Sequence, residues 1–130
     1  MNFKQHLADQ ILVGEKTVTR REPSPNPNSP WWVERCAYIP GRDYAICPGR
    51  GKNAVGRMLV VSVEKVRLGW LDDAEAANEG FATAYDFTQL WASMRKGGIY
   101  DPRQKVWRVE FELLAVAAEP FPELAESGRA

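Results

Sequence analysis

The chain has 130 residues, of which 45% are hydrophobic and 11% aromatic, so it is long and apolar enough for one domain with a single core. Its 17 basic residues balance its 17 acidic residues, which excludes a general polyanion binder with an overall positive charge. The charges are uneven along the chain, because eleven basic and six acidic residues lie within residues 1–67, and six basic and eleven acidic residues follow. We therefore expect the positive surface in the first half.

No apolar run approaches the roughly 20 residues that span a bilayer, and the opening MNFKQHLADQ lacks the apolar core of a signal peptide. We therefore expect a cytoplasmic protein in which Cys36 and Cys47 stay reduced. Because the chain has one histidine, His6, and no CxxC pair, the usual ligands of a zinc site are missing. We predict neither a metal nor a cofactor.

Residues 3–13 are predicted to form a helix. Phe3, Leu7 and Ile11 recur every four residues, and Asn2 stands where its side chain could cap the first turn. A glycine three residues after Ile11 provides the signal that ends the helix.

The β-branched run over residues 17–21 predicts a strand, because such side chains suit a pleated sheet. Side chains alternate along a strand, so Thr19 and Arg21 share one face and Arg20 takes the other. Lys16 can face Thr19 only if it still belongs to the turn before the strand.

Residues 22–40 contain five prolines and several turn-forming residues, and they predict a long loop. Loops of this length in compact domains are usually functional or disordered. Two interpretations of its adjacent indoles, Trp31 and Trp32, stay open. They could cap the core, or they could form a stacking wall or lid over a base.

The remaining elements follow from periodicity and turn signals. We expect strands over residues 43–47, 57–68 and 105–113, a basic turn over 48–52, and helices over 72–80 and 84–96. Helices and strands do not alternate as in a doubly wound sheet, so the predicted class is α+β. Residues 1–116 are predicted to be one domain and 117–130 a flexible C-terminal tail.

The densest polar cluster spans residues 14–21 and carries an amine, two hydroxyls and two guanidinium groups. A lysine whose pKa is lowered by burial or by neighbouring arginines could deprotonate a threonine and create a nucleophile for acyl transfer. The same residue types on a strand also make an ordinary solvated face. The residues alone leave both interpretations open.

This cluster resembles the opening signature of ASCH domains, a helix followed by G-x-K-T-x-T-x-R, and every fixed position of the signature is filled by Gly14 to Arg21. The acidic segment 72–81 is similar to the acidic helix of that family, and 107–113 to its closing strand. The resemblance covers about residues 3–114. It implies a PUA-like fold, a small β-barrel with helices packed at the barrel openings and a cleft between helix and barrel.

The family includes small amidohydrolases that remove the acetyl group of N(4)-acetylcytidine with a Lys, a Thr and a Glu. The resemblance implies that Thr19 is the nucleophile, Lys16 its base and Glu79 a group that binds the base or transfers a proton to the leaving amine. Arg21 matches the last position of the signature and is expected to bind the substrate. Glu75, one helical turn before Glu79, is the alternative carboxylate, although it could serve as the capping-box partner at the start of the same helix.

A second set of residues predicts a basic, aromatic rim that binds substrate. Arg50 and Lys52 lie among glycines that allow close backbone approach to phosphates, although the segment lacks the pattern of a Walker loop. An ordinary basic hairpin turn is the alternative. The other predicted members of this rim are Arg42, Tyr44, Arg57 and the indole pair, Trp31 and Trp32.

Two functions therefore remain open, with a nucleoside or single-stranded RNA as the expected partner. The first is a metal-independent amidohydrolase acting on an acylated cytidine. The second is a non-catalytic module that binds RNA or a modified base. Ribonuclease activity is also implied for some family members, but a lone histidine argues against a two-histidine acid–base pair.

Overall fold

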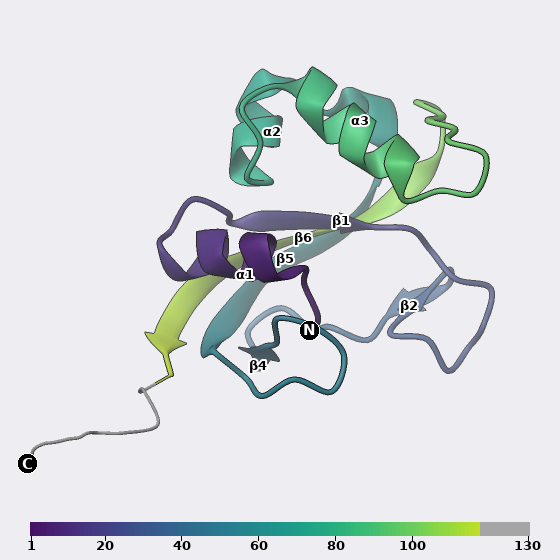
Figure 1. Cartoon of the computed structure of the whole chain (residues 1–130). Helices are drawn as coiled ribbons and strands as arrows, with labels where there is room; N and C mark the ends of the chain where they lie inside the picture. The colour runs from purple at the N-terminus through teal and green to yellow at the C-terminus, as the bar shows by residue number, and fades with distance from the viewer. Residues whose placement is uncertain (118–130) are drawn as a thin grey trace, which may run out of the picture.

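The computed structural model describes residues 1–117. Its main element is a curled antiparallel sheet of four strands in the order β1-β6-β5-β4, which forms a half-barrel (Figure 1). The strands are β1 (Val18–Arg21), β4 (Asp43–Ile46), β5 (Gly56–Arg67) and β6 (Lys105–Val116). All four predicted strands are therefore present, and the long pair β5 and β6 forms the centre of the sheet. The predicted tail covers residues 117–130, of which 118–130 lie outside the described residues, and the division into domain and tail stays a prediction.

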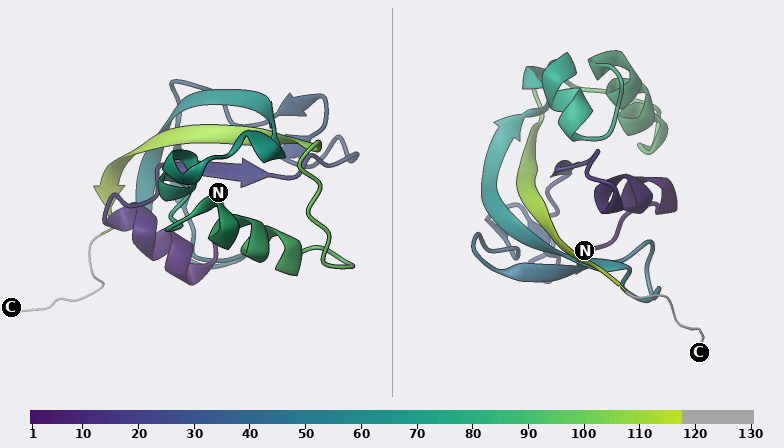
Figure 2. Two further views of the ribbon diagram at one scale, coloured as in Figure 1. Left: turned by 90° about the horizontal axis from the view of Figure 1, so that it is seen from above. Right: turned by 90° about the vertical axis from the view of Figure 1, so that its left-hand side faces the viewer.

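Three helices pack around this sheet, as Figure 2 shows from two sides. They are α1 (Gln5–Leu12), α2 (Asp73–Asn78) and α3 (Ala84–Ser93), and the 3₁₀ turn η1 (Leu68–Trp70) precedes α2. Their presence beside the antiparallel sheet confirms the predicted α+β class. No helix within the described residues is long and apolar enough to cross a membrane.

The predicted caps are only partly confirmed. Asp72 caps α2 by accepting a hydrogen bond from the Glu75 main-chain N–H at 2.8 Å. The predicted cap of α1 is wrong, because Lys4 occupies the N-cap position without a side-chain hydrogen bond. Asn2 instead pairs with Cys47 in an isolated bridge, which ties the start of the chain to the end of β4. This pairing extends the backbone at Asn2 and moves the helix start to Gln5.

The predicted loop of residues 22–40 contains a small sheet of its own. β2 (Trp31–Trp32) pairs with β3 (Arg35–Cys36), and Trp31 is registered with Cys36. The Trp31 ring packs against the main core and lies 5.0 Å from the Tyr38 ring, while the Trp107 Nε1 donates to the Trp32 carbonyl at 3.0 Å. These contacts attach the segment to the half-barrel, as the core-capping interpretation expects.

The core is divided into two clusters, one on each side of β1. The first cluster joins α1 to the concave sheet, with Phe3, Ala8, Ile11, Cys36, Ile46, Met58, Val60, Val109 and Phe111 buried. The second lies under α2 and α3 and contains Leu68, Leu71, Ala76, Phe87, Trp91 and Val106. Strand β6 supplies residues to both clusters because alternate side chains point to opposite faces. This division leaves β1 at the sheet edge, between α1 and the α2–α3 pair (Figures 1 and 2).

Candidate functional site

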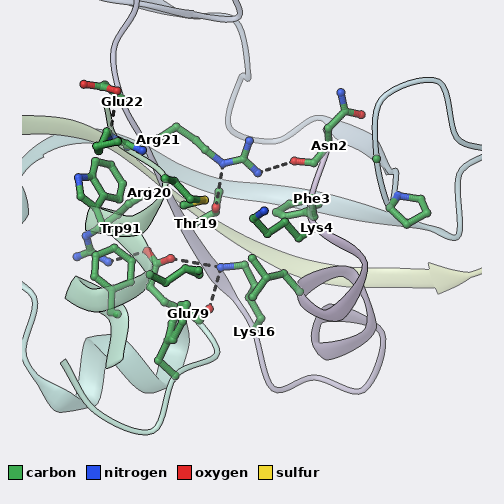
Figure 3. A pocket seen from close by; sticks show the side chains of 18 residues that line it. Asn2, Phe3, Lys4, Lys16, Thr19, Arg20, Arg21, Glu22, Glu79 and Trp91 are labelled. Atoms are coloured by element: carbon green, nitrogen blue, oxygen red, sulfur yellow. Dashed lines mark hydrogen bonds and ion pairs between the residues drawn. The ribbon is translucent and has the colours of Figure 1, made fainter. Parts of the chain in front are cut away.

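A pocket of about 440 Å³ opens where β1 lies between α1 and α3. Its walls come from the start of α1, from β1, from the turn after β4, from the end of α2 and from α3, as the close view in Figure 3 shows. The described chain buries four polar or charged residues: Lys16, Thr19, Arg20 and Glu79. All four line this pocket. Burying polar groups is costly unless they are paired, so their concentration in one place marks the pocket as the candidate site.

Lys16 and Glu79 form a buried ion pair at the centre of the pocket. The Lys16 Nζ lies 3.2 Å from the Glu79 Oε1, and both side chains are almost fully enclosed. The same ammonium group donates to the Glu79 carbonyl at 2.9 Å and to the Val18 carbonyl at 2.8 Å. A lysine ammonium has three N–H donors, so these three acceptors occupy all of them.

Burial lowers the pKa of Lys16 from its usual value of 10.5, and the cations of Arg21 and Arg20 act in the same direction. The neighbouring carboxylate of Glu79 opposes this shift. We take the net direction to be downward, because the side chain is only 2% exposed and stands among several positive charges. The neutral amine that a general base requires is thus more accessible than in a solvated lysine.

Arg20 was missed as a site residue by sequence reasoning. Its Nη1 donates to the Glu79 Oε2 at 2.9 Å and its Nη2 to the Glu75 Oε1 at 2.7 Å. Strand alternation placed Arg20 on the face opposite Thr19, and the sequence did not indicate a partner for its side chain. The acidic segment 72–81 was the sequence feature that could have indicated a role for Arg20, because carboxylates that become buried pair with cations.

Glu75 and Glu79 have different positions, which the sequence could not separate. Glu79 points into the pocket and is 2% exposed, whereas Glu75 does not line the pocket. The Glu75 carboxylate binds Arg108 Nε at 2.7 Å as well as Arg20. Its predicted role as the side-chain partner in the capping box is therefore wrong, because only its main-chain N–H bonds to Asp72. Hydrogen bonds from Arg108, with those from Arg20, lower the pKa of Glu75 to about 2 despite partial burial.

Thr19 and Arg21 share one face of β1, which confirms the predicted side-chain alternation. The Arg21 Nε donates to the Thr19 Oγ1 at 3.1 Å, and the Arg21 Nη2 donates to the Asn2 carbonyl at 2.7 Å. The guanidinium carbon lies 4.9 Å from the Phe3 ring centre and 5.1 Å from the Trp31 ring centre, where cation–π attraction holds it in place. A fixed cation thus stands beside the Thr19 hydroxyl.

An apolar part of the wall was not identified from the sequence as part of the site. Phe81, Phe87, Leu90 and Trp91 line the pocket on the side of α3. The sequence predicted the helix but not this role, because an apolar face that packs inward and one that lines a pocket have the same spacing. The Trp91 Nε1 is buried and has no hydrogen-bond partner among the described residues.

The predicted basic, aromatic rim is dispersed around the outside of this pocket. Among the eight predicted substrate-binding residues, Arg21 is the one that lines it. Pro48 and Gly49 line the pocket, and Arg50 and Lys52, which are exposed and absent from the lining, follow them in the same turn. The others, Trp31, Trp32, Arg42, Tyr44 and Arg57, are absent from the lining.

Three of these outlying residues have structural contacts. The Trp31 ring supports Arg21, as described above. The Tyr44 hydroxyl accepts a hydrogen bond from the Ile39 N–H at 2.9 Å. Arg57 on β5 is exposed, and its Nη2 lies 2.8 Å from the Oδ2 of Asp43 on the neighbouring strand β4. A role of these residues in substrate binding stays a prediction.

Comparisons with known proteins were made with both sequence and structure. The sequence matches no protein-family model. No curated protein matches it either. Among solved structures, a protein of Enterococcus faecalis from family DUF984 superposes with a TM-score of 0.67 at 17% identity, over 86% of this chain and 69% of that protein. An ASCH domain from Lactobacillus crispatus superposes with a TM-score of 0.58 at 16% identity, over 85% of this chain and 71% of that one.

A point mutant of the ASCH protein of Zymomonas mobilis is also similar, with a TM-score of 0.55 at 15% identity, over 86% of this chain and 66% of that protein. The chain therefore has the fold of ASCH domains. This result confirms the predicted ASCH and PUA-like fold, with a half-barrel in place of a fully closed barrel. At these identities the likeness concerns the fold, and it does not assign an activity.

Proposed function

We propose that the protein is an amidohydrolase that removes the acyl group from an N(4)-acylated cytosine base or nucleoside. One observation carries the proposal: Lys16, Thr19 and Glu79, which the resemblance to ASCH domains implies as the catalytic set, line one pocket and are all buried. A volume of about 440 Å³ lies within the usual range of roughly 300–1,000 Å³ for small-molecule sites. A nucleoside is a ligand of the size that such a pocket holds.

The proposed reaction has two steps, in which Thr19 Oγ1 first attacks the carbonyl carbon of the acyl group. The hydroxyl proton passes to neutral Lys16, and the guanidinium of Arg21 offsets the negative charge on the tetrahedral intermediate. The C–N bond then breaks, and the exocyclic nitrogen takes up that proton from Lys16 with Glu79 orienting the amine. Water hydrolyses the acyl-threonine ester, releases the carboxylic acid and restores the Thr19 hydroxyl.

The described structure has no hydrogen bond between Lys16 and Thr19. Proton transfer between them therefore requires either a water in the pocket or the release of one Lys16 hydrogen bond when substrate enters. Lowering of the Lys16 pKa by burial supports such a release, because the neutral amine donates fewer hydrogen bonds.

The test is turnover of N(4)-acetylcytidine, followed by chromatography of the cytidine formed. Thr19→Ala is expected to lower kcat by about a thousandfold or more, because the nucleophile is lost. Thr17→Ala is the matched control, since Thr17 is a neighbouring threonine that does not line the pocket. It should retain the wild-type rate.

Full activity in Thr19→Ala would contradict the role of Thr19 as nucleophile. Absence of cytidine with the wild-type protein would contradict hydrolysis of this substrate. Binding of cytidine should be measured on the same variants by calorimetry, so that loss of catalysis can be distinguished from loss of ligand binding.

A second candidate function is non-catalytic binding of RNA or a modified base. It is favoured by the complete occupation of the Lys16 donors, which suits a structural ammonium, and by the exposed Arg50 and Lys52, which follow the pocket-lining Gly49 in the chain. A base could occupy the pocket while the flanking phosphates contact this turn.

Single-stranded RNA provides the test of this second function. If Arg50 and Lys52 contact phosphates, changing both to alanine should make the slope of log affinity against log salt shallower by about 1.4. Arg103→Ala is the control, because its side chain is 87% exposed and it lies outside the pocket lining. Equal slopes in the wild type and the double variant would reject this contact.

A further inference from the structure

The backbone of β1 directs half of its polar groups away from the sheet. The Phe111 N–H donates to the Thr17 carbonyl at 2.9 Å, and the register pairs Thr19 with Val109. In an antiparallel ladder, hydrogen-bonded and non-hydrogen-bonded pairs alternate. Thr19 therefore bonds to β6, whereas the main-chain N–H and C=O groups of Val18 and Arg20 point to the outer edge.

On this outer edge, the carbonyl of Val18 is already bonded, whereas neither main-chain group of Arg20 is. The Val18 carbonyl accepts the hydrogen bond from the Lys16 Nζ at 2.8 Å. Within residues 1–117, the main-chain N–H and C=O of Arg20 take part in no hydrogen bond. Arg20 is only 6% exposed. Buried main-chain groups are nearly always paired, so this pair of groups is expected to bind a ligand or ordered water.

The outer edge of β1 faces the pocket. Thr19 and Arg21 extend from one face of the strand and Arg20 from the other, and all three line the same pocket. Side chains of opposite faces can reach one pocket only where that pocket runs along the free edge of the strand. The views in Figures 2 and 3 agree with this placement, with β1 between α1 and α3.

We propose that the main-chain N–H and C=O of Arg20 bind the edge of a planar heterocycle that carries a ring-nitrogen acceptor next to an exocyclic N–H donor. The two groups of one residue point in the same direction on a strand edge, so they match such an acceptor–donor pair. In cytosine these atoms are N3 and the N(4)–H. The choice of cytosine as the base rests on the proposed function. The inference adds that the main chain of Arg20 recognises this base.

A peptide strand is a less suitable occupant of this edge. Strand addition needs a run of free main-chain groups along the edge. Here the ammonium of Lys16 already occupies the Val18 carbonyl, and α1 and α3 enclose the pocket on both sides. Of the two residues whose main-chain groups face this edge, Arg20 is the one with both its N–H and its C=O unbonded within residues 1–117, and this pair suits a small heterocycle with two adjacent polar atoms.

The test compares three ligands that the enzyme cannot hydrolyse. Cytidine offers both atoms, 3-deazacytidine lacks the N3 acceptor, and N(4),N(4)-dimethylcytidine lacks the N–H donor. Each of the two analogues should bind the wild-type protein about tenfold more weakly than cytidine, because one buried main-chain group would stay unpaired. Calorimetry measures the three affinities.

Amide NMR spectra of the ¹⁵N-labelled protein identify the position. On saturation with cytidine, the Arg20 amide proton should move downfield, because it gains a hydrogen bond. The Thr19 amide is the internal control, since it already bonds to β6 and should move less. The downfield shift of the Arg20 amide proton should be smaller with 3-deazacytidine than with cytidine, because 3-deazacytidine lacks the acceptor atom.

The inference is overturned if the three ligands bind equally, if none binds at millimolar concentration, or if the Arg20 amide is unchanged at saturation. Hydrolysis of acetylcytidine with equal binding of the three ligands would leave the proposed function intact. The predicted ligand preference without hydrolysis would support the inference and contradict the amidohydrolase.

Discussion

Replacing Glu79 with Gln is expected to lower the free energy of unfolding by about 3–5 kcal/mol. The carboxylate contacts Lys16 at 3.2 Å and Arg20 at 2.9 Å, and these side chains are about 3% exposed. Gln has nearly the same shape but no charge, so two buried cations would remain without their shared counter-ion. Urea unfolding at neutral pH measures the change.

A matched control for this prediction is Glu110→Gln. Glu110 also contacts an arginine, Arg108, but at 3.7 Å and with a side chain that is 46% exposed. Ion pairs of this exposed kind usually contribute about 0–1 kcal/mol. If Glu79→Gln changed stability no more than the control, the buried network would not support the fold. Activity of the Glu79 variant should be read only after this measurement, because a loss could come from unfolding.

Acid is expected to destabilise the protein by about 1–2 kcal/mol through Glu75, whose pKa is lowered from 4.5 to about 2. The full shift would correspond to about 3 kcal/mol, but water screens a carboxylate that is 24% exposed. The folded state holds this carboxylate in the ionised form, because Arg108 and Arg20 donate to it. Below about pH 5 the unfolded chain binds the proton more readily than the folded chain does. The stabilisation that the Glu75 carboxylate contributes is therefore fully present above about pH 5, and it is lost as the pH falls toward 2.

Urea unfolding over a series of pH values tests this expectation. Other carboxylates also titrate in this range, so the informative quantity is the difference between the wild type and Glu75→Gln. That difference should be largest near neutral pH and should shrink toward pH 2. A constant difference across the range would show that the arginine contacts do not shift this titration.

Much of the candidate site could be predicted from local sequence. The signature from Gly14 to Arg21 identified Lys16 and Thr19, and strand alternation correctly placed Thr19 and Arg21 on one face. Both arguments depend on spacing within a few residues, where backbone geometry is nearly independent of the rest of the fold.

The partners of these residues could not be predicted in the same way. Arg20 meets Glu79 across 59 residues of sequence, and Glu75 meets Arg108 across 33. Such pairs depend on how α2 docks over β1 and β6, which periodicity does not describe. The role of Trp31 and Trp32 could not be predicted for the same reason. Only the packing of the 22–40 segment decides whether an indole covers the core or a ligand.

The sequence by itself determined the α+β class, the four strands of the main sheet and the chemical types gathered around β1, since these follow from local periodicity and from a motif of contiguous residues. The tertiary structure alone decided which carboxylate enters the pocket, that Arg20 joins it, and that the rim residues stand outside it. Burial is the physical reason: it results from the packing of α1, α2 and α3 around an edge strand, and it gives Lys16 its lowered pKa. The free main-chain pair of Arg20 is likewise a consequence of the position of β1 at the edge of the sheet.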